Sequence, residues 1–172
     1  LYIWADPRES RRIIRIEPGE GAKYWSECQE GGYICVEWDA VGNLESFESK
    51  EDFREAFIRV FSERYRNKRS LLKKSCKLLW TFCQLEPGDI VVATRGTSLI
   101  LGVGEVVEPG YECMDDRPEL KHVVRISWDE GKAHEFESQK GWANVSVSLV
   151  SSALLQRIQT GKVRPAIVEG IY

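Results

Sequence analysis

The sequence predicts a single α+β domain, built on a curved, barrel-like sheet of about five to six strands flanked by helices. The chain has 172 residues, 42% of them hydrophobic, which is enough to close one sizeable core. Runs of β-branched residues recur along it and are interrupted by two or three helical patterns. Strand and helix do not alternate regularly, so a doubly wound parallel sheet is excluded. We expect residues 1–172 to form one domain.

Strand, helix and strand are expected in the first part of the chain. Residues 1–4 alternate like a short strand, and residues 12–16 form an apolar strand closed by a Pro-Gly turn. In residues 21–29 apolar side chains recur every three positions, which predicts a short helix ended by a glycine pair. Residues 33–38 then form a strand that runs out into a loop at Trp38.

The remainder of the chain predicts a long helix, a hairpin, a further strand and a mixed tail. Ser49, followed by acidic residues and then by aromatic residues at helical spacing, is typical of an N-cap. Residues 90–95 and 99–107 surround a glycine-containing turn and predict a hairpin. Residues 122–128 alternate as another strand, and residues 147–160 begin as a strand and end as a helix.

The composition excludes several classes of protein. Lys and Arg number 24 against 27 Asp and Glu, a net charge of −3, so bulk charge does not drive binding to nucleic acid or membranes. No signal peptide or long apolar run is present, so we expect a cytoplasmic protein without a membrane partner. The five cysteines form no C-x-x-C pair, which indicates neither a zinc site nor a disulfide framework. Because the first residue is Leu rather than Met, we expect either a piece of a larger protein or a shortened chain.

No set of residues indicates catalysis, a metal or a cofactor. His122 lies in a predicted strand and His134 in a polar hairpin, and neither has a nucleophile partner at a known spacing. Gly102 and Gly104 lie inside a strand pattern with no helix after them, which excludes a phosphate-binding loop. These glycines are expected to let the sheet bend or a ligand approach the backbone. We expect a chain that is not an enzyme.

One segment is strongly basic although the chain as a whole is acidic. Aromatic Tyr65 is interleaved with its charges, and such a patch is typical of phosphate contacts with salt-dependent affinity. A solvated helix end and linker explains the same charges equally well. The phosphate-contacting candidates are Arg66, Lys68, Arg69, Lys73, Lys74 and Lys77.

Trp38 stands out among the six tryptophans. It ends a predicted strand and is followed by Asp39 and a Gly-Asn loop. An aromatic plane beside a carboxylate suits a planar heterocycle, which stacks on its face and hydrogen-bonds at its edge. A tryptophan that covers the core is the alternative, and the spacing does not decide between the two.

Several short blocks follow one another in order along residues 12–128. They are IIRIEPGE from Ile13, YICVEWD from Tyr33, GNL from Gly42, Trp80-x-Phe82, PGDIVVA from Pro87 and GVGEV from Gly102. These blocks resemble the EVE domains of the PUA-like superfamily. Their order is most similar to the EVE-type N-terminal domains of archaeal McrB-like modification-dependent restriction proteins, which implies that this chain is the N-terminal part of a larger protein.

The resemblance implies a curved β-barrel flanked by helices and related to the YTH readers of N6-methyladenosine. Such domains flip a modified base out of the nucleic acid and hold it in an aromatic pocket. A separate AAA+ GTPase motor and a partner nuclease then cut the DNA. Because this chain lacks the motif G-x-x-x-x-G-K-[ST], it is expected to be the recognition module alone.

The resemblance also implies the residues of the pocket. The strand-end aromatic falls on Trp38, with Asp39 beside it as edge acceptor or backbone donor. The second wall belongs to the loop after the hairpin, where Tyr111 is the aromatic candidate and Met114 the softer one. Trp80 belongs to the recurring Trp-x-Phe block and either lines the pocket or is structural.

Two further positions follow from the same resemblance. Thr94 and Arg95 lie at the hairpin turn, where they would hold the flanking phosphate. The family places a polar, edge-reading residue near residues 17–20, and this chain has no Asn there.

We therefore expect a DNA-binding module that captures a methylated base, N6-methyladenine first, extruded from methylated double-stranded DNA. Its implied partners are a GTPase motor domain in the same chain and a nuclease subunit. An RNA-binding PUA-like or YTH-like reader, a reader of 5-methylcytosine or 5-hydroxymethylcytosine, and a protein-interaction domain with all tryptophans in the core remain open alternatives.

Overall fold

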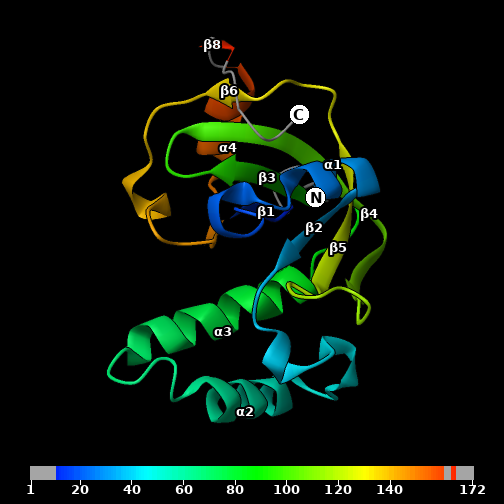
Figure 1. The fold of residues 1–172 in the computed structure, drawn as a ribbon, viewed down its shortest axis with the longest axis vertical. Helices are drawn as coiled ribbons and strands as arrows, with labels where there is room; N and C mark the ends of the chain where they lie inside the picture. Colours follow the sequence, from blue (N-terminus) through cyan, green and yellow to red (C-terminus); the bar gives the residue numbers. More distant parts are fainter. Residues whose placement is uncertain (1–10, 161–163, 166–172) are drawn as a thin grey trace, which may run out of the picture.

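The computed structural model describes residues 11–160 and 164–165 and has one mixed sheet with helices packed around it (Figure 1). The order of the main strands is β2-β5-β4-β3-β1-β7, and short β6 pairs with β4 and β8. The strands β1 and β3 are parallel, and the other pairs are antiparallel. Strand bounds are β1 Ile13–Ile16, β2 Tyr33–Val36, β3 Ile90–Arg95, β4 Leu99–Cys113, β5 His122–Trp128, β6 His134–Glu135, β7 Val147–Leu149 and β8 Arg164–Pro165.

The predicted α+β class is therefore confirmed, but the sheet is not closed into a barrel. The end strands β2 and β7 do not pair with each other within the described part of the chain. The predicted strand at residues 1–4 lies outside the described residues. The predicted hairpin forms as β3 and β4.

Four α-helices surround the sheet in the described part of the chain: α1 Trp25–Gly31, α2 Lys50–Phe61, α3 Arg69–Cys83 and α4 Ser152–Thr160. The prediction of α2 is confirmed, since the Ser49 side chain caps it by accepting from the backbone N–H of Asp52 at 3.1 Å. Figure 1 shows α2 and α3 together at one end of the molecule. Short 3-10 turns lie at η1 Glu20–Ala22, η2 Asp39–Val41, η3 Leu44–Ser46 and η4 Lys140–Trp142.

The sheet separates two hydrophobic cores. Alternation along β1 sends Ile14 and Ile16 into the larger core, which also contains side chains of α1, α2 and α3. Ile13 points the other way, into a smaller core that contains Leu155 and Ile158 of α4. Arg15 shares the direction of Ile13 and is fully buried beside this smaller core.

The glycines of β4 make room for side chains. Trp25 packs edge-on against Trp128 with ring centroids 4.8 Å apart. A Cβ at Gly102 would lie 2.8 Å from the Trp25 ring, and one at Gly104 would lie 2.4 Å from Ile126 Cγ2. Close packing is therefore the observed reason for glycine at these two positions.

Candidate functional site

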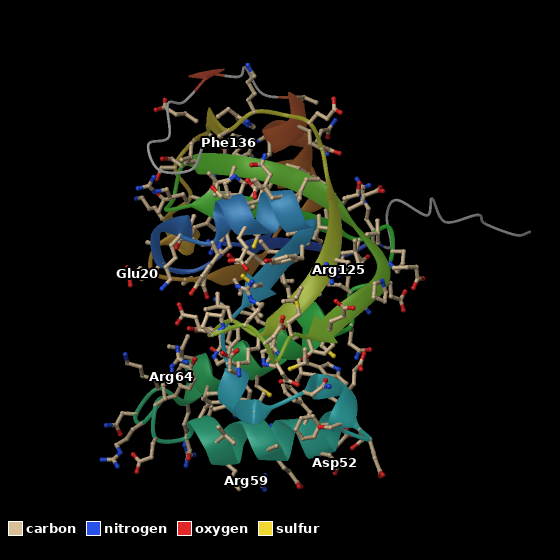
Figure 2. All side chains as sticks on the ribbon, turned by 45° about the vertical axis from the view of Figure 1, so that its right-hand side comes forward. Glu20, Asp52, Arg59, Arg64, Arg125 and Phe136 are labelled. Atoms are coloured by element: carbon tan, nitrogen blue, oxygen red, sulfur yellow. The ribbon has the colours of Figure 1, made fainter. Side chains whose placement is uncertain are left out.

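A groove of about 600 Å³ opens on one side of the molecule. It lies between the turn after β1, the residue that follows β2, and the segment before β7. Gly19, Glu20, Glu37 and Arg64 contribute to its walls, with residues 144–146. Glu20 and Arg64 are seen on the same side of the molecule in Figure 2. A hollow of this volume is in the range of small-molecule binding sites.

A smaller recess of about 150 Å³ adjoins the groove. The two hollows share Glu37, Arg64 and residues 144–146. Trp38 and Tyr65 form the aromatic part of the recess, and Lys74 of α3 contributes a charge. The segments that meet here are far apart in the sequence. The sheet and α3 bring them together.

A left-handed backbone turn sets the position of Trp38. Its φ of 79° and ψ of 37° end β2 and lead the chain into η2. The residue is 5% exposed, and its indole Nε1–H donates to the hydroxyl of Tyr65 at 2.9 Å. The indole thus contributes to a wall of the recess while most of its surface belongs to the core.

A chain of buried hydrogen bonds holds the Trp38 backbone. Its carbonyl accepts from Nε2 of His122 at 2.9 Å, so this nitrogen carries the proton. Nδ1 of the neutral ring then accepts from the hydroxyl of Tyr111 at 2.7 Å, and this hydroxyl accepts from the Leu44 N–H. Burial lowers the pKa of His122 and outweighs the opposing effect of its bond to Trp38. The neutral imidazole therefore holds the Trp38 backbone in place behind the recess through its hydrogen bonds.

The groove is acidic, with four glutamates and two cations among the side chains that line it. Arg64 pairs with Glu37 at 2.9 Å, and Lys23 pairs with Glu119 at 2.8 Å. The remaining two glutamates are Glu17 and Glu20. An excess of carboxylates disfavours a phosphate and favours a neutral ligand that offers hydrogen-bond donors.

Comparison with known proteins identifies a family for this chain. A family model described as a domain of unknown function, DUF8426, matches residues 13–153. The chain belongs to the DUF8426 family. No curated protein and no solved structure matches it.

Two polar side chains of the DUF8426 domain reach the recess from the segment before β7. Asn144 and Ser146 line both hollows, and their side chains have no hydrogen-bond partner within the described residues. No spacing or motif in the sequence indicated these residues, because they join the groove only through the pairing of β7 with β1.

Buried Arg15 ties this segment to the sheet. Its guanidinium donates to Ser148 Oγ at 3.0 and 2.9 Å, to Thr94 Oγ1 at 3.3 Å, and to the carbonyl of Val145. It also lies 5.3 Å from the ring centre of Trp142. Burial lowers the pKa of Arg15 to about 10, against the attraction of Glu17. Arg15 is a positioning residue for the groove wall.

Several pocket residues implied by the resemblance lie away from the recess. The prediction that Tyr111 lies in a loop was wrong, because β4 continues to Cys113 and buries it. Asp39 does not line the groove, and its Oδ1 accepts from the Lys121 N–H at 2.7 Å. Met114 is partly buried against the larger core. Trp80 lines a separate cleft between α2 and α3.

The residues predicted to contact phosphate also lie in several different places. Thr94 is fully buried by its contact with Arg15, whereas Arg95 is exposed at the end of β3. Lys74 borders the recess, and Lys73 and Lys77 border the separate cleft. The other three candidates, Arg66, Lys68 and Arg69, are exposed between α2 and the first turn of α3.

The described residues contain neither a candidate metal site nor a helix that could span a membrane. Residues 11–160 contain no group of three or more His, Cys, Asp and Glu residues that could hold a metal ion. Among the helices that the structure describes, none is long and apolar enough to cross a membrane.

Proposed function

We propose that this DUF8426 domain is a DNA-binding reader that holds an extruded methylated base, N6-methyladenine first, in the recess beside Trp38. The observation that supports it is the recess itself, where Trp38 and Lys74 meet Tyr65 and Arg64 beside the groove. Trp38 and Lys74 are also two of the residues that the sequence indicates for base and phosphate contacts.

The chemistry of the recess suits a nucleobase better than a phosphate. Two aromatic side chains contribute to its wall, and stacking on an aromatic ring contributes about 1–3 kcal/mol per base. The amide of Asn144 and the hydroxyl of Ser146 are available for the polar edge of the base. The acidic groove outside is compatible with a neutral ring and unfavourable for phosphate.

Entry of the base is coupled to movement of side chains in this proposal. Trp38 is 5% exposed, so full stacking requires part of its cover to shift. The ion pair of Arg64 and Glu37 borders both hollows, and its side chains are 47% and 39% exposed. Such an exposed ion pair costs little free energy to break. Its two side chains can therefore move apart to let the base enter the recess.

Methyl recognition needs shape as well as stacking. Extrusion of a base costs a few kcal/mol, and burial of one methyl group returns about 0.8 kcal/mol. These energies alone give only a small preference. A strong preference for the methylated base requires that the unmodified base fits the recess poorly, either because it leaves an empty space where the methyl group would lie or because it leaves a polar group without a partner. The amide of Asn144 has no hydrogen-bond partner within the described residues and is the group of the recess best placed to contact the polar edge of the base.

The fold relationship and the larger assembly belong to the same proposal. The resemblance of the sequence blocks supports a PUA-like, EVE-type domain of a modification-dependent restriction protein. In that protein a GTPase motor domain in the same chain and a nuclease subunit would act on the methylated DNA that this domain recognises. The chain contributes recognition, and the chemistry of cleavage belongs to its partners.

Fluorescence anisotropy with labelled duplexes tests the proposal. Duplexes of one sequence carry N6-methyladenine, 5-methylcytosine, 5-hydroxymethylcytosine or no modification, and a methylated RNA of that sequence is added. We expect the tightest binding to N6-methyladenine DNA and loss of this preference in Asn144→Ala, while Gln156→Ala on α4 retains it. Equal affinity for every duplex, or an unchanged preference in Asn144→Ala, contradicts the proposal.

A further inference from the structure

A third hollow, the helical cleft, lies on the other side of α3 from the recess. It has a volume of about 200 Å³ between α2 and α3. Helix α3 turns Leu71, Lys74, Ser75 and Leu78 toward the recess. Its Lys73, Cys76, Lys77 and Trp80 line the helical cleft. The two hollows are therefore separate, and the helical cleft has no part in holding the extruded base.

Four cations surround the helical cleft, and no acidic side chain lines it. Lys50 and Arg54 are one helical turn apart on α2, and Lys73 and Lys77 are one turn apart on α3. Within the described part of the chain, none of the four side chains has an ion pair or a hydrogen bond. Nearby Arg64 and Arg66, by contrast, each pair with a glutamate.

The four like charges repel one another weakly, because all four side chains are exposed to water. Like charges at i and i+4 repel each other along a helix, and here two such pairs face the same hollow. Lys50 and Arg54 also act on Cys76 inside the helical cleft, where their charges oppose the rise in its pKa that burial causes. A bound anion would relieve the repulsion between all four side chains.

An aromatic surface lies among the charges. Trp80 is partly exposed and stacks on Phe53, with ring centroids 5.0 Å apart and an angle of 28° between the planes. Phe53 covers part of the indole, and the remainder contributes to the helical cleft together with Ile58. Charge and a flat apolar surface thus occur in one small hollow.

We propose that the helical cleft binds a nucleotide, with its phosphate on the four cations and its base against Trp80. A phosphate carries more negative charge than a carboxylate and has three acceptor oxygens, so one group can meet several lysines in a small volume. An acidic peptide would need several side chains to supply the same charge. The nucleotide can be free or part of a single strand. A free nucleotide offers one phosphomonoester with about two negative charges, whereas a strand offers the same kind of base with one charge on each of its successive phosphodiesters.

Isothermal titration of the full chain with AMP, inorganic phosphate, a single-stranded oligothymidylate and an oligoglutamate peptide tests this site. We expect a nucleotide, free or in the strand, to bind more tightly than phosphate alone, because phosphate lacks the stacking contact. The double charge reversal Lys73→Glu with Lys77→Glu should weaken that binding about tenfold or more. Arg59→Glu with Lys140→Glu changes the net charge equally, lies outside the helical cleft, and should leave the affinity unchanged.

The outcomes separate this site from the recess. AMP binding that is sensitive to the lysine variant assigns a free nucleotide, and binding of the oligothymidylate alone assigns a strand. In Asn144→Ala, which changes the groove and the recess but not the helical cleft, nucleotide binding should persist. Absence of binding by AMP and by the strand, equal loss in both double variants, or tighter binding of the oligoglutamate overturns the proposal, whatever the result for methylated duplexes.

Discussion

The indole N–H of Trp38 donates to the hydroxyl of Tyr65 at 2.9 Å, in a buried contact across 27 positions of the sequence. It connects the end of β2 with the turn between α2 and α3. This single bond joins the aromatic side chains of the recess. The orientation of each ring therefore depends on the other.

Removal of the bond between Trp38 and Tyr65 should destabilise the domain without unfolding it. We expect Tyr65→Phe to cost about 1–3 kcal/mol, because it leaves the buried indole N–H without a partner. Trp38→Phe in the same background should cost less than in the wild type, since the bond is already absent. Urea denaturation of the two single variants and the double variant measures this coupling. Strictly additive losses would contradict it.

The neutral state of His122 predicts a pH dependence of stability. Burial lowers its folded pKa, so the unfolded chain binds the proton at a higher pH than the folded one does. Stability is fully present above the ordinary histidine value of about 6.5 and declines as the pH falls below it. Urea midpoints across this range should show a smaller decline in His122→Gln. His134→Gln separates the contribution of the other histidine, and identical slopes in wild type and His122→Gln would refute the assignment.

Arg15 should be required to hold residues 142–148, which include one wall of the groove, in a single conformation. Arg15→Met retains apolar volume but leaves the acceptors on Thr94, Val145 and Ser148 without their donor. We expect a loss of about 2–3 kcal/mol in the free energy of unfolding and faster amide exchange in residues 142–148. Arg95→Met, an exposed change at the end of β3, is the matched control. Unchanged exchange in this segment would remove the positioning role.

Close packing at Gly104 predicts a strong effect of a single methyl group. In Gly104→Ala the new Cβ would lie 2.4 Å from Ile126 Cγ2 and 2.7 Å from the Ser127 carbonyl oxygen. We expect a loss of about 1–3 kcal/mol. Gly141→Ala, where nothing lies within 4 Å of the new Cβ, should change stability little. Thermal unfolding followed by circular dichroism compares the two, and equal midpoints would contradict the packing explanation.

Charge at Lys74 should strengthen DNA binding without contributing to base preference. Lys74→Glu places a negative charge at the rim of the recess. We expect weaker binding of methylated and plain duplexes alike, with a salt slope lower by about one. Anisotropy titrations at several salt concentrations measure both quantities. A variant that loses only the preference for the methylated duplex would show that Lys74 contacts the base.

The sequence correctly predicted elements that depend only on neighbouring residues. The hairpin of β3 and β4 and the cap at Ser49 formed as expected, because turn glycines and capping side chains act within a few residues. The start of α3 at Arg69 was not predicted. Its first turn is basic and contains no acidic residue, so the charge that usually marks a helix N-terminus is absent.

Site residues were harder to predict, because side-chain direction and burial depend on packing. Tyr111 appeared to belong to a loop, yet β4 continues through it and directs its hydroxyl to His122. Thr94 looked available at a turn, but Arg15 reaches it from β1 and buries it. Neither partner is near in the sequence, so no spacing could indicate the contact.

The sequence by itself determined the α+β class, the helix that begins at Ser49, the β3 and β4 hairpin, and the presence of a basic segment in an acidic chain. These features depend on hydrophobic period, turn chemistry and composition, which are properties of neighbouring residues. Only the tertiary structure decided that the basic residues of α3 divide between two hollows, and that Asn144 joins Trp38 in the recess. The physical reason is that a helix distributes consecutive side chains around its axis, and that strand pairing unites segments separated by a hundred residues or more, as β1 and β7 are.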